Sequence, residues 1–142
     1  MKVLVDTSIW SLAFRRKKES KSLRHTIIIN ELKELINETR AVIIGPIRQE
    51  ILSGISDEKQ YLSLTEKLKA FDDVSINQSD FELAAEFYNI CRRKGIQGSH
   101  IDFLICAVAL QNNFSVFTAD KDFDHYSKIL AVKLHRPRKT DH

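Results

Sequence analysis

Short runs of consecutive apolar residues constrain the fold of this chain more than any other feature. They lie at residues 2–6 (Lys-Val-Leu-Val-Asp), 41–45 (Ala-Val-Ile-Ile-Gly), 115–118 (Ser-Val-Phe-Thr) and 131–134. None alternates cleanly between apolar and polar residues, which is typical of strands that are covered on both faces. We therefore expect four short, buried strands.

Helical patterns separate these runs. Apolar residues at helical spacing predict helices at 23–38, 46–54, 58–68, 79–94 and 99–112. Ser79, with Glu82 three residues later, indicates the start of the fourth helix, and Gly95 indicates its end. Residues 99–112 are apolar almost all round, so this helix should be deeply buried. The alternation of strands and helices favours an α/β fold, a parallel sheet with helices on both faces.

The length and composition of the chain indicate one domain at residues 1–142. Its 142 residues are 43% hydrophobic, and 22 basic against 19 acidic residues give a net charge of +3. That charge permits a polyanionic partner without requiring one. Cys91 and Cys106 lie in apolar helical patterns and should be reduced core residues. We expect no transmembrane helix and no signal peptide, and hence a cytoplasmic protein without membrane contact.

Four acidic residues stand in unusual places. Asp6 ends the first strand and Asp120 follows the third, and the carboxyl ends of parallel strands meet at one edge of a sheet. Asp102 is the only acid in its helix, in the first turn after Ser99. Glu50 lies beside the apolar face of the helix that leaves the second strand. The other helical acids alternate with polar residues and should be solvated: Glu31, Glu34, Glu38, Glu58, Glu66 and Glu86.

Carboxylates that converge in a partly buried pocket repel each other unless positive charge compensates them. A divalent cation is the simplest compensation, and a set of oxygen ligands suits Mg²⁺ or Mn²⁺ rather than Zn²⁺. Taken singly, each acid also has a structural interpretation: Asp6 or Asp102 as a helix cap, Asp120 in a turn, Glu50 as surface. The joint arrangement of the four favours a functional site.

Four motifs carry a family resemblance. They are Val-Leu-Val-Asp-Thr-Ser near the N-terminus, Pro-Ile-Arg-Gln-Glu-Ile-Leu after the second strand, Ser-His-Ile-Asp-Phe-Leu-Ile-Cys around Asp102, and Phe-Thr-Ala-Asp-Lys-Asp-Phe around Asp120. Together they resemble the PIN-domain nucleases, and most closely the VapC-type toxins of type II toxin–antitoxin pairs. The resemblance covers essentially the whole chain, with the motifs in family order.

The resemblance implies a three-layer α/β/α sandwich with a short, mostly parallel central sheet. It implies an Mg²⁺- or Mn²⁺-dependent endoribonuclease, a homodimer whose partners are an RNA substrate and a VapB-like antitoxin. The family's catalytic, metal-binding acids fall on Asp6, Glu50, Asp102 and Asp120. Whether Glu50 orients water, acts as a base or holds a second ion stays open. Auxiliary positions fall on Thr7, Ser8, Thr118 and Asp122.

Two basic stretches would contact RNA or an acidic antitoxin segment, unless they are simply solvated. The first is Arg15, Arg16, Lys17 and Lys18, continued by Lys21 and Arg24, and the second is the tail from His135 to Lys139.

Two other functions stay open. One is an acid-cluster phosphatase with Asp6 as nucleophile, although such enzymes usually carry a second Asp where this chain has Ser8. The other is a non-catalytic interaction module of the same fold.

Overall fold

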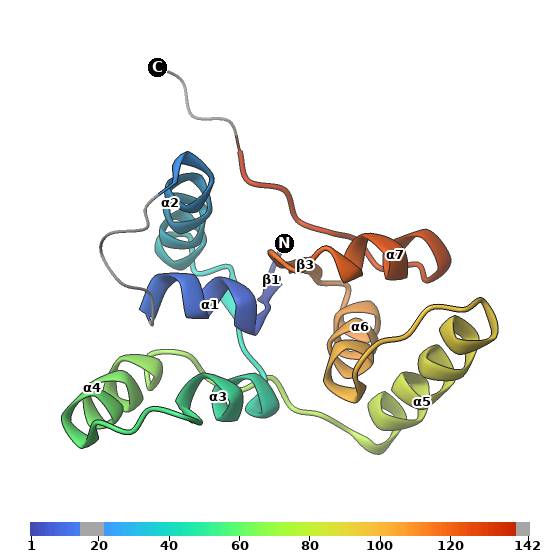
Figure 1. The fold of residues 1–142 in the computed structure, drawn as a ribbon, viewed down its shortest axis with the longest axis horizontal. Coiled ribbons are helices and arrows are strands. Elements are labelled where there is room, and N and C mark those ends of the chain that lie inside the picture. The colour runs from blue at the N-terminus through green and yellow to red at the C-terminus, as the bar shows by residue number, and fades with distance from the viewer. Residues whose placement is uncertain (15–21, 139–142) are drawn as a thin grey trace.

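The computed structural model describes residues 1–14 and 22–138 and shows helices around a short sheet (Figure 1). The strands are β1 (Val3–Val5), β2 (Ala41–Val42) and β3 (Ser115–Phe117). The helices are α1 (Thr7–Phe14), α2 (Leu23–Asn37), α3 (Gly45–Leu52), α4 (Glu58–Leu68), α5 (Gln78–Arg93), α6 (His100–Asn112) and α7 (Asp122–Ile129).

The sheet has the strand order β2-β1-β3, and both pairings are parallel. Helices α1 and α2 lie on one side of it, and α5, α6 and α7 lie on the other (Figure 1). Helices cover the sheet on both faces, and all of β1 and β3 is buried. The expected α/β/α sandwich with a parallel central sheet is therefore confirmed.

The five helices predicted from periodicity are all present, with small differences at their ends. Helix α5 begins earlier than expected, because Asn77 rather than Ser79 is its cap. The Asn77 side chain and the Asp80 carboxylate form a reciprocal capping box, so the pairing of Ser79 with Glu82 was wrong. Helix α7 was not predicted, and α1 was anticipated only in the interpretation of Asp6 as a helix cap, since eight residues show too little periodicity.

The fourth predicted strand, at 131–134, is reduced to a single bridge. Leu134 pairs in parallel with Val116, and two backbone hydrogen bonds of 2.9 and 2.7 Å join Val116 to Lys133 and His135. Pro137 soon follows, and it cannot donate a backbone hydrogen bond to extend the pairing. We call residues 131–138 the C-terminal strap, because this segment lies along the free edge of β3.

The core lies on both faces of the sheet. Its largest fully buried side chains are Trp10, Tyr126, Phe103, Phe117 and Phe123. Helix α6 is buried from Phe103 to Ala109, as its composition predicts. Cys91 and Cys106 are both buried and free, which confirms their interpretation as reduced core residues. Among the described helices, none has the length and apolarity needed to cross a membrane.

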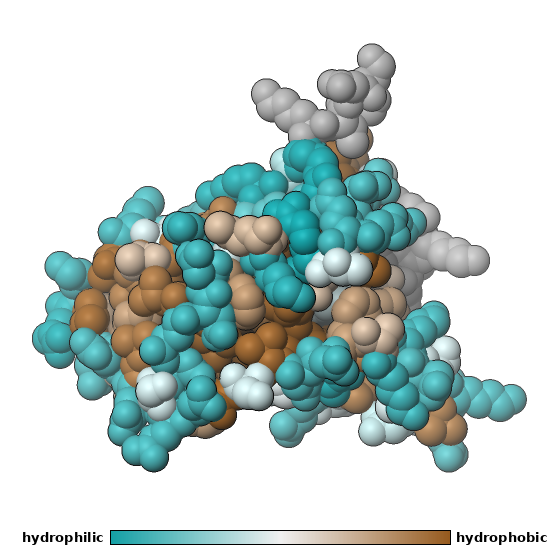
Figure 2. All heavy atoms as spheres, turned by 180° about the vertical axis from the view of Figure 1, so that it is seen from behind, coloured by the Kyte–Doolittle hydropathy of each residue, from teal (hydrophilic) through white to brown (hydrophobic). Residues whose placement is uncertain are grey.

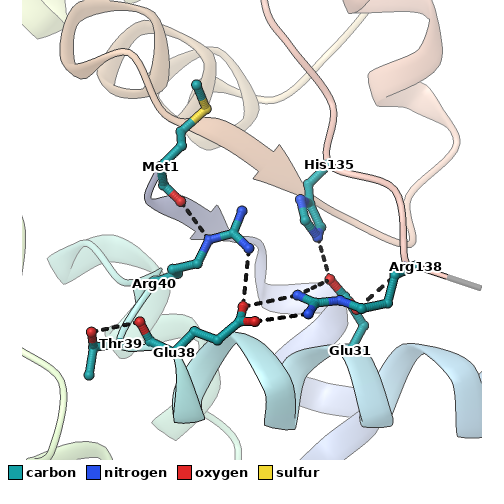
Figure 3. Close-up of polar contacts among 7 residues, drawn as sticks. All are labelled: Met1, Glu31, Glu38, Thr39, Arg40, His135 and Arg138. Carbon is teal, nitrogen blue, oxygen red and sulfur yellow. Dashed lines mark hydrogen bonds and ion pairs between the residues drawn. The ribbon is translucent and has the colours of Figure 1, made fainter.

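The structure corrects the interpretation of Glu31 as a solvated residue. Glu31 lies on α2 and is only 3% exposed. The Arg138 guanidinium binds it through Nε at 2.8 Å, and Nε2 of His135 lies 2.6 Å from its carboxylate (Figure 3). Sequence periodicity misled here because the C-terminal strap, more than a hundred residues away, covers this face of α2.

A second carboxylate extends the contact between strap and helix. Glu38 binds Arg138 at 2.9 Å and Arg40 at 3.1 Å, and Arg40 also donates to the backbone oxygen of Met1 (Figure 3). Hydrogen bonds from Arg138 and Arg40 hold the pKa of Glu38 at about 2. Burial tends to raise the pKa of Glu31, but its bonds to Arg138 and His135 outweigh burial and lower it. The network thus anchors the strap with ionised carboxylates.

Replacing Glu31 by Gln should reduce the free energy of unfolding by about 2 kcal/mol, because the Arg138 guanidinium loses a buried counter-charge and an amide group replaces one of the carboxylate oxygens that face Arg138 and His135. Glu34→Gln, an exposed change on the same helix, is the matched control and should have little effect. Urea denaturation at pH 7 measures both. Equal stabilities of the two variants would contradict this role for Glu31.

The contribution of Glu31 to the free energy of unfolding should depend on pH. The pKa of Glu31 is lower in the folded state than its ordinary value of 4.5, so its stabilising effect is complete above that pH. The effect is lost as the pH falls below 4.5 toward the folded-state pKa. The difference in stability between wild type and Glu31→Gln should therefore shrink in acid. A difference that stays constant from pH 7 to pH 3 would contradict the assignment.

Candidate metal centre at the carboxyl edge of the sheet

Asp6 occupies the centre of the site, directly after β1. It is 6% exposed, and its Oδ2 accepts hydrogen bonds from Ser8 Oγ at 2.7 Å and from Thr118 Oγ1 at 2.8 Å. Its backbone N–H donates to the carbonyl oxygen of Phe117, continuing the pairing of β1 with β3. Burial raises the pKa of Asp6, and the hydroxyl bonds partly oppose this rise.

The two hydroxyls also connect the ends of the strands. Ser8 Oγ accepts a hydrogen bond from the backbone N–H of Ala119 at 2.9 Å, and Thr118 Oγ1 accepts one from Asp120 at 3.0 Å. The loop after β3 is thereby fixed to the start of α1. The predicted auxiliary residues Ser8 and Thr118 thus hold Asp6 and orient the loop that carries Asp120.

Three further acids meet beside Asp6. Carboxylate oxygens of Asp102, Asp120 and Asp122 all lie within 4.8 Å of one another. Asp102 comes from the first turn of α6, where the Ser99 hydroxyl accepts the backbone N–H of Asp102 at 3.1 Å. Asp122 begins α7, and its backbone N–H binds the Asp120 carboxylate at 2.9 Å. Helix starts and strand ends therefore supply all three carboxylates.

Tyr126 is a site residue that the sequence did not reveal. Its hydroxyl donates to Oδ2 of Asp102 at 2.7 Å, and its ring is fully buried between Phe103 and Phe123. The only signal was the spacing of Phe123 and Tyr126 on one face of a short helix, which equally describes an ordinary core pair. Burial and the bond to Asp102 raise the pKa of the Tyr126 phenol, which keeps it a donor.

Glu50 lies apart from these carboxylates. It is exposed on α3 and accepts a hydrogen bond of 2.6 Å from the hydroxyl of Thr7, the residue that follows Asp6. It does not belong to the group of three acids whose spacing could hold a metal ion. Of the four predicted acids, the structure thus joins Asp102 and Asp120 to Asp122, places Asp6 beside them and connects Glu50 through Thr7.

The electrostatics of the site suit a divalent cation. Burial raises the pKa of Asp102, the Tyr126 hydrogen bond lowers it, and the charges of Asp6 and Asp120 add to the rise. Within residues 1–14 and 22–138, no Lys or Arg forms an ion pair with Asp6, Asp102, Asp120 or Asp122. A group of uncompensated carboxylate oxygens with this spacing fits a hard ion such as Mg²⁺ or Mn²⁺.

Part of the predicted basic surface falls outside the residues that the structure describes. Arg15, Arg16, Lys17, Lys18 and Lys21 lie outside the described residues, as does Lys139. Arg24, His135, Arg136 and Arg138 are described, and Arg138 is engaged by Glu31 and Glu38.

Comparison with known proteins places this geometry in a family. A model of the PIN domain matches residues 3–129. The chain belongs to the PIN domain family. Among its relatives are ribonuclease VapC11 of Mycobacterium tuberculosis and VapC ribonuclease Mb1587 of Mycobacterium bovis. Each is 30% identical over 131 residues, which cover 89% of this chain and 92% of the relative.

Solved structures share the fold at lower identity. FitAcB of Neisseria gonorrhoeae superposes with a TM-score of 0.74 at 19% identity, over 95% of this PIN domain and 97% of that chain. VapBC2 of Rickettsia felis, bound to a promoter DNA fragment, superposes with a TM-score of 0.72 at 18% identity. The match covers 95% of this chain and 98% of that chain. These likenesses support the PIN arrangement of strands and helices described above.

A glycine gives a test of how Tyr126 is held. A Cβ atom at Gly98 would lie 2.8 Å from the Phe103 ring and would overlap the hydroxyl of Tyr126. Gly98→Ala should therefore destabilise the protein by about 1–3 kcal/mol through overpacking. In a Tyr126→Phe background, where the hydroxyl is absent, the same change should cost less. Thermal unfolding of the four proteins in this cycle measures the difference, and strictly additive effects would contradict the packing described.

Proposed function

We propose that this protein is a metal-dependent endoribonuclease and the toxin of a toxin–antitoxin pair. The observation that carries the proposal is the convergence of Asp102, Asp120 and Asp122 beside the buried Asp6. The ribonuclease names of two relatives that span almost the whole domain support the substrate class.

Asp6, Asp102, Asp120 and Asp122 would hold Mg²⁺ or Mn²⁺. The bound ion would activate water and neutralise charge on the phosphate. Ser8 and Thr118 keep Asp6 oriented, and Tyr126 keeps Asp102 oriented, so the carboxylates are positioned before substrate arrives. Glu50, exposed at the rim and held by Thr7, is placed to accept a proton from water or to hold a second ion.

The phosphatase alternative fits the geometry less well. An aspartyl nucleophile needs a carboxylate oxygen that can approach phosphorus from an open side. Asp6 is 6% exposed, and its Oδ2 already accepts hydrogen bonds from both Ser8 and Thr118. An RNA cleavage assay distinguishes the nuclease from a non-catalytic interaction module, because such a module would bind metal without cleaving RNA.

Purified protein should cleave single-stranded RNA with Mn²⁺ or Mg²⁺ and lose this activity with a chelator. Asp6→Asn and Asp102→Asn should each reduce cleavage at least about a hundredfold, because they remove ligand charge. Glu66→Gln, an exposed acid of α4 paired with Lys69, is the control and should cleave normally. Circular dichroism checks that the variants are folded. Cleavage by folded Asp6→Asn without metal would refute the proposal.

An antitoxin is the proposed protein partner. One neighbouring structure is described as VapBC-5 of M. tuberculosis, a member of the VapBC family of toxin–antitoxin systems, with a TM-score of 0.66 at 17% identity. For the present chain this supports a small partner protein that binds and restrains the nuclease. The reading frame next to its gene is the place to look for that partner.

A homodimer is the proposed assembly, with its contact over α5 and α6. Phe81 is 56% exposed and lies beside a depression of about 280 Å³ lined by Pro46, Phe81, Ala84, Ala85, His100, Ile101 and Leu104. Figure 2 shows hydrophobic side chains gathered over much of the side where these helices lie, at the left of that view. Exposed apolar surface of this kind favours burial against a second copy.

Phe81→Glu should convert the dimer to a monomer, because it places a charge in the apolar contact. Leu62→Glu on α4 is the matched control, since Leu62 is 57% exposed and lies elsewhere. Light scattering after gel filtration measures both. If the two variants have the same mass as wild type, the contact over α5 and α6 is wrong.

A further inference from the structure

The described basic residues of the tail, His135, Arg136 and Arg138, differ in what they contact. Arg138 binds the carboxylates of Glu31 and Glu38, and His135 binds Glu31. Arg136, between them in the chain, is directed elsewhere. Its side chain is 73% exposed, and the one ion pair that it forms with a described residue is with the Asp124 carboxylate of α7, at 3.3 Å. The two residues that flank Arg136 thus anchor the strap, and Arg136 is left at its surface.

Arg136 lies in a small depression that continues the acidic site. Its lining includes Thr118 and Asp120 of the site, Lys121 and Asp124 just after them, Arg136 of the strap and Arg24 of α2. Its cationic members therefore come from three separate parts of the chain: Arg24, Lys121 and Arg136. Within the described residues, Arg24 and Lys121 form no ion pair.

A nuclease with an acidic centre needs positive charge beside it. RNA that places one phosphate at the carboxylates must place its neighbouring phosphates on the adjacent surface, and the carboxylates repel them. Cations that neutralise backbone phosphates supply most of the sequence-independent affinity for nucleic acid. The depression brings such cations directly beside Asp120.

We propose that Arg136, with Arg24 and Lys121, binds the RNA backbone next to the cleavage site, and that the Glu31 contacts of the strap hold Arg136 there. This inference rests on the proposed ribonuclease function. The weak pair with Asp124 keeps the guanidinium over the depression until phosphate replaces the carboxylate. Arg136 is thus a substrate-binding residue, and Arg138 is a structural anchor.

RNA binding by the full chain tests the proposal. Affinity for a fluorescent single-stranded RNA is measured by anisotropy in an Asp102→Asn background with chelator, so that the RNA stays intact. At 0.1 M salt, Arg136→Ala should weaken binding about fivefold and reduce the slope of log affinity against log salt by about 0.7, as expected for one lost phosphate contact. Arg93→Ala, which removes the same charge from α5, should change neither quantity.

A second variant shifts affinity in the opposite direction. Asp124→Asn frees Arg136 from its competing carboxylate and should strengthen RNA binding. The gain in affinity should be larger in the protein that has Arg136 than in one that already carries Arg136→Ala. Cleavage with Mn²⁺ by Arg136→Ala should show a raised KM with an unchanged kcat, because the contact is the same in ground and transition states.

The outcomes separate the two proposals. A wild-type protein that cleaves no RNA with metal refutes the proposed function. A wild-type protein that cleaves RNA, with Arg136→Ala and Arg93→Ala equal in affinity and salt dependence, refutes the role of Arg136 alone. The role of Arg136 in RNA binding is also refuted if Arg136→Ala loses binding to an acidic partner protein while its affinity for RNA is unchanged.

Discussion

The hydrogen bonds between the buried Asp6 carboxylate and the hydroxyls of Ser8 and Thr118 are the contacts on which the rest of the site depends. They join the residue after β1 to the first residue after β3, across a parallel pairing that brings both strand ends to one edge. A carboxylate in this position is costly without donors, and the two hydroxyls partly offset that cost. Because the same hydroxyls accept backbone N–H groups of the next loop, the position of Asp120 follows from that of Asp6.

The sequence predicted the parts of this molecule that arise from local pattern and strand direction. Apolar runs located the strands, and the placement of Asp6 and Asp120 after two of them indicated a shared edge. Ser99 and Asp102 could be placed because a helix start has a recognisable chemistry. Membership of the PIN domain family agrees with the resemblance drawn from the four motifs.

Contacts between segments that are distant in the chain could not be predicted from local sequence patterns. Nothing near Glu31 in the chain distinguishes it from Glu34, since only the arrival of the strap buries one and leaves the other exposed. Tyr126 likewise looked like a core aromatic, because its hydroxyl meets Asp102 only once α7 packs against α6. Asp122 was a secondary candidate, and the turn into α7 brings its carboxylate to the other two acids.

The C-terminal strap has a consequence for how the sheet meets its surroundings. Within residues 1–14 and 22–138, β3 has a neighbouring strand only on the β1 side, and a single bridge at Leu134 closes the other side together with the ionic anchor on α2. An unprotected edge strand is a template on which other chains can add strands. A version of this chain cut short before the strap would leave the backbone groups of β3 unpaired on that side, and its molecules would be prone to join edge to edge. The strap therefore covers an edge that would otherwise be open to such pairing.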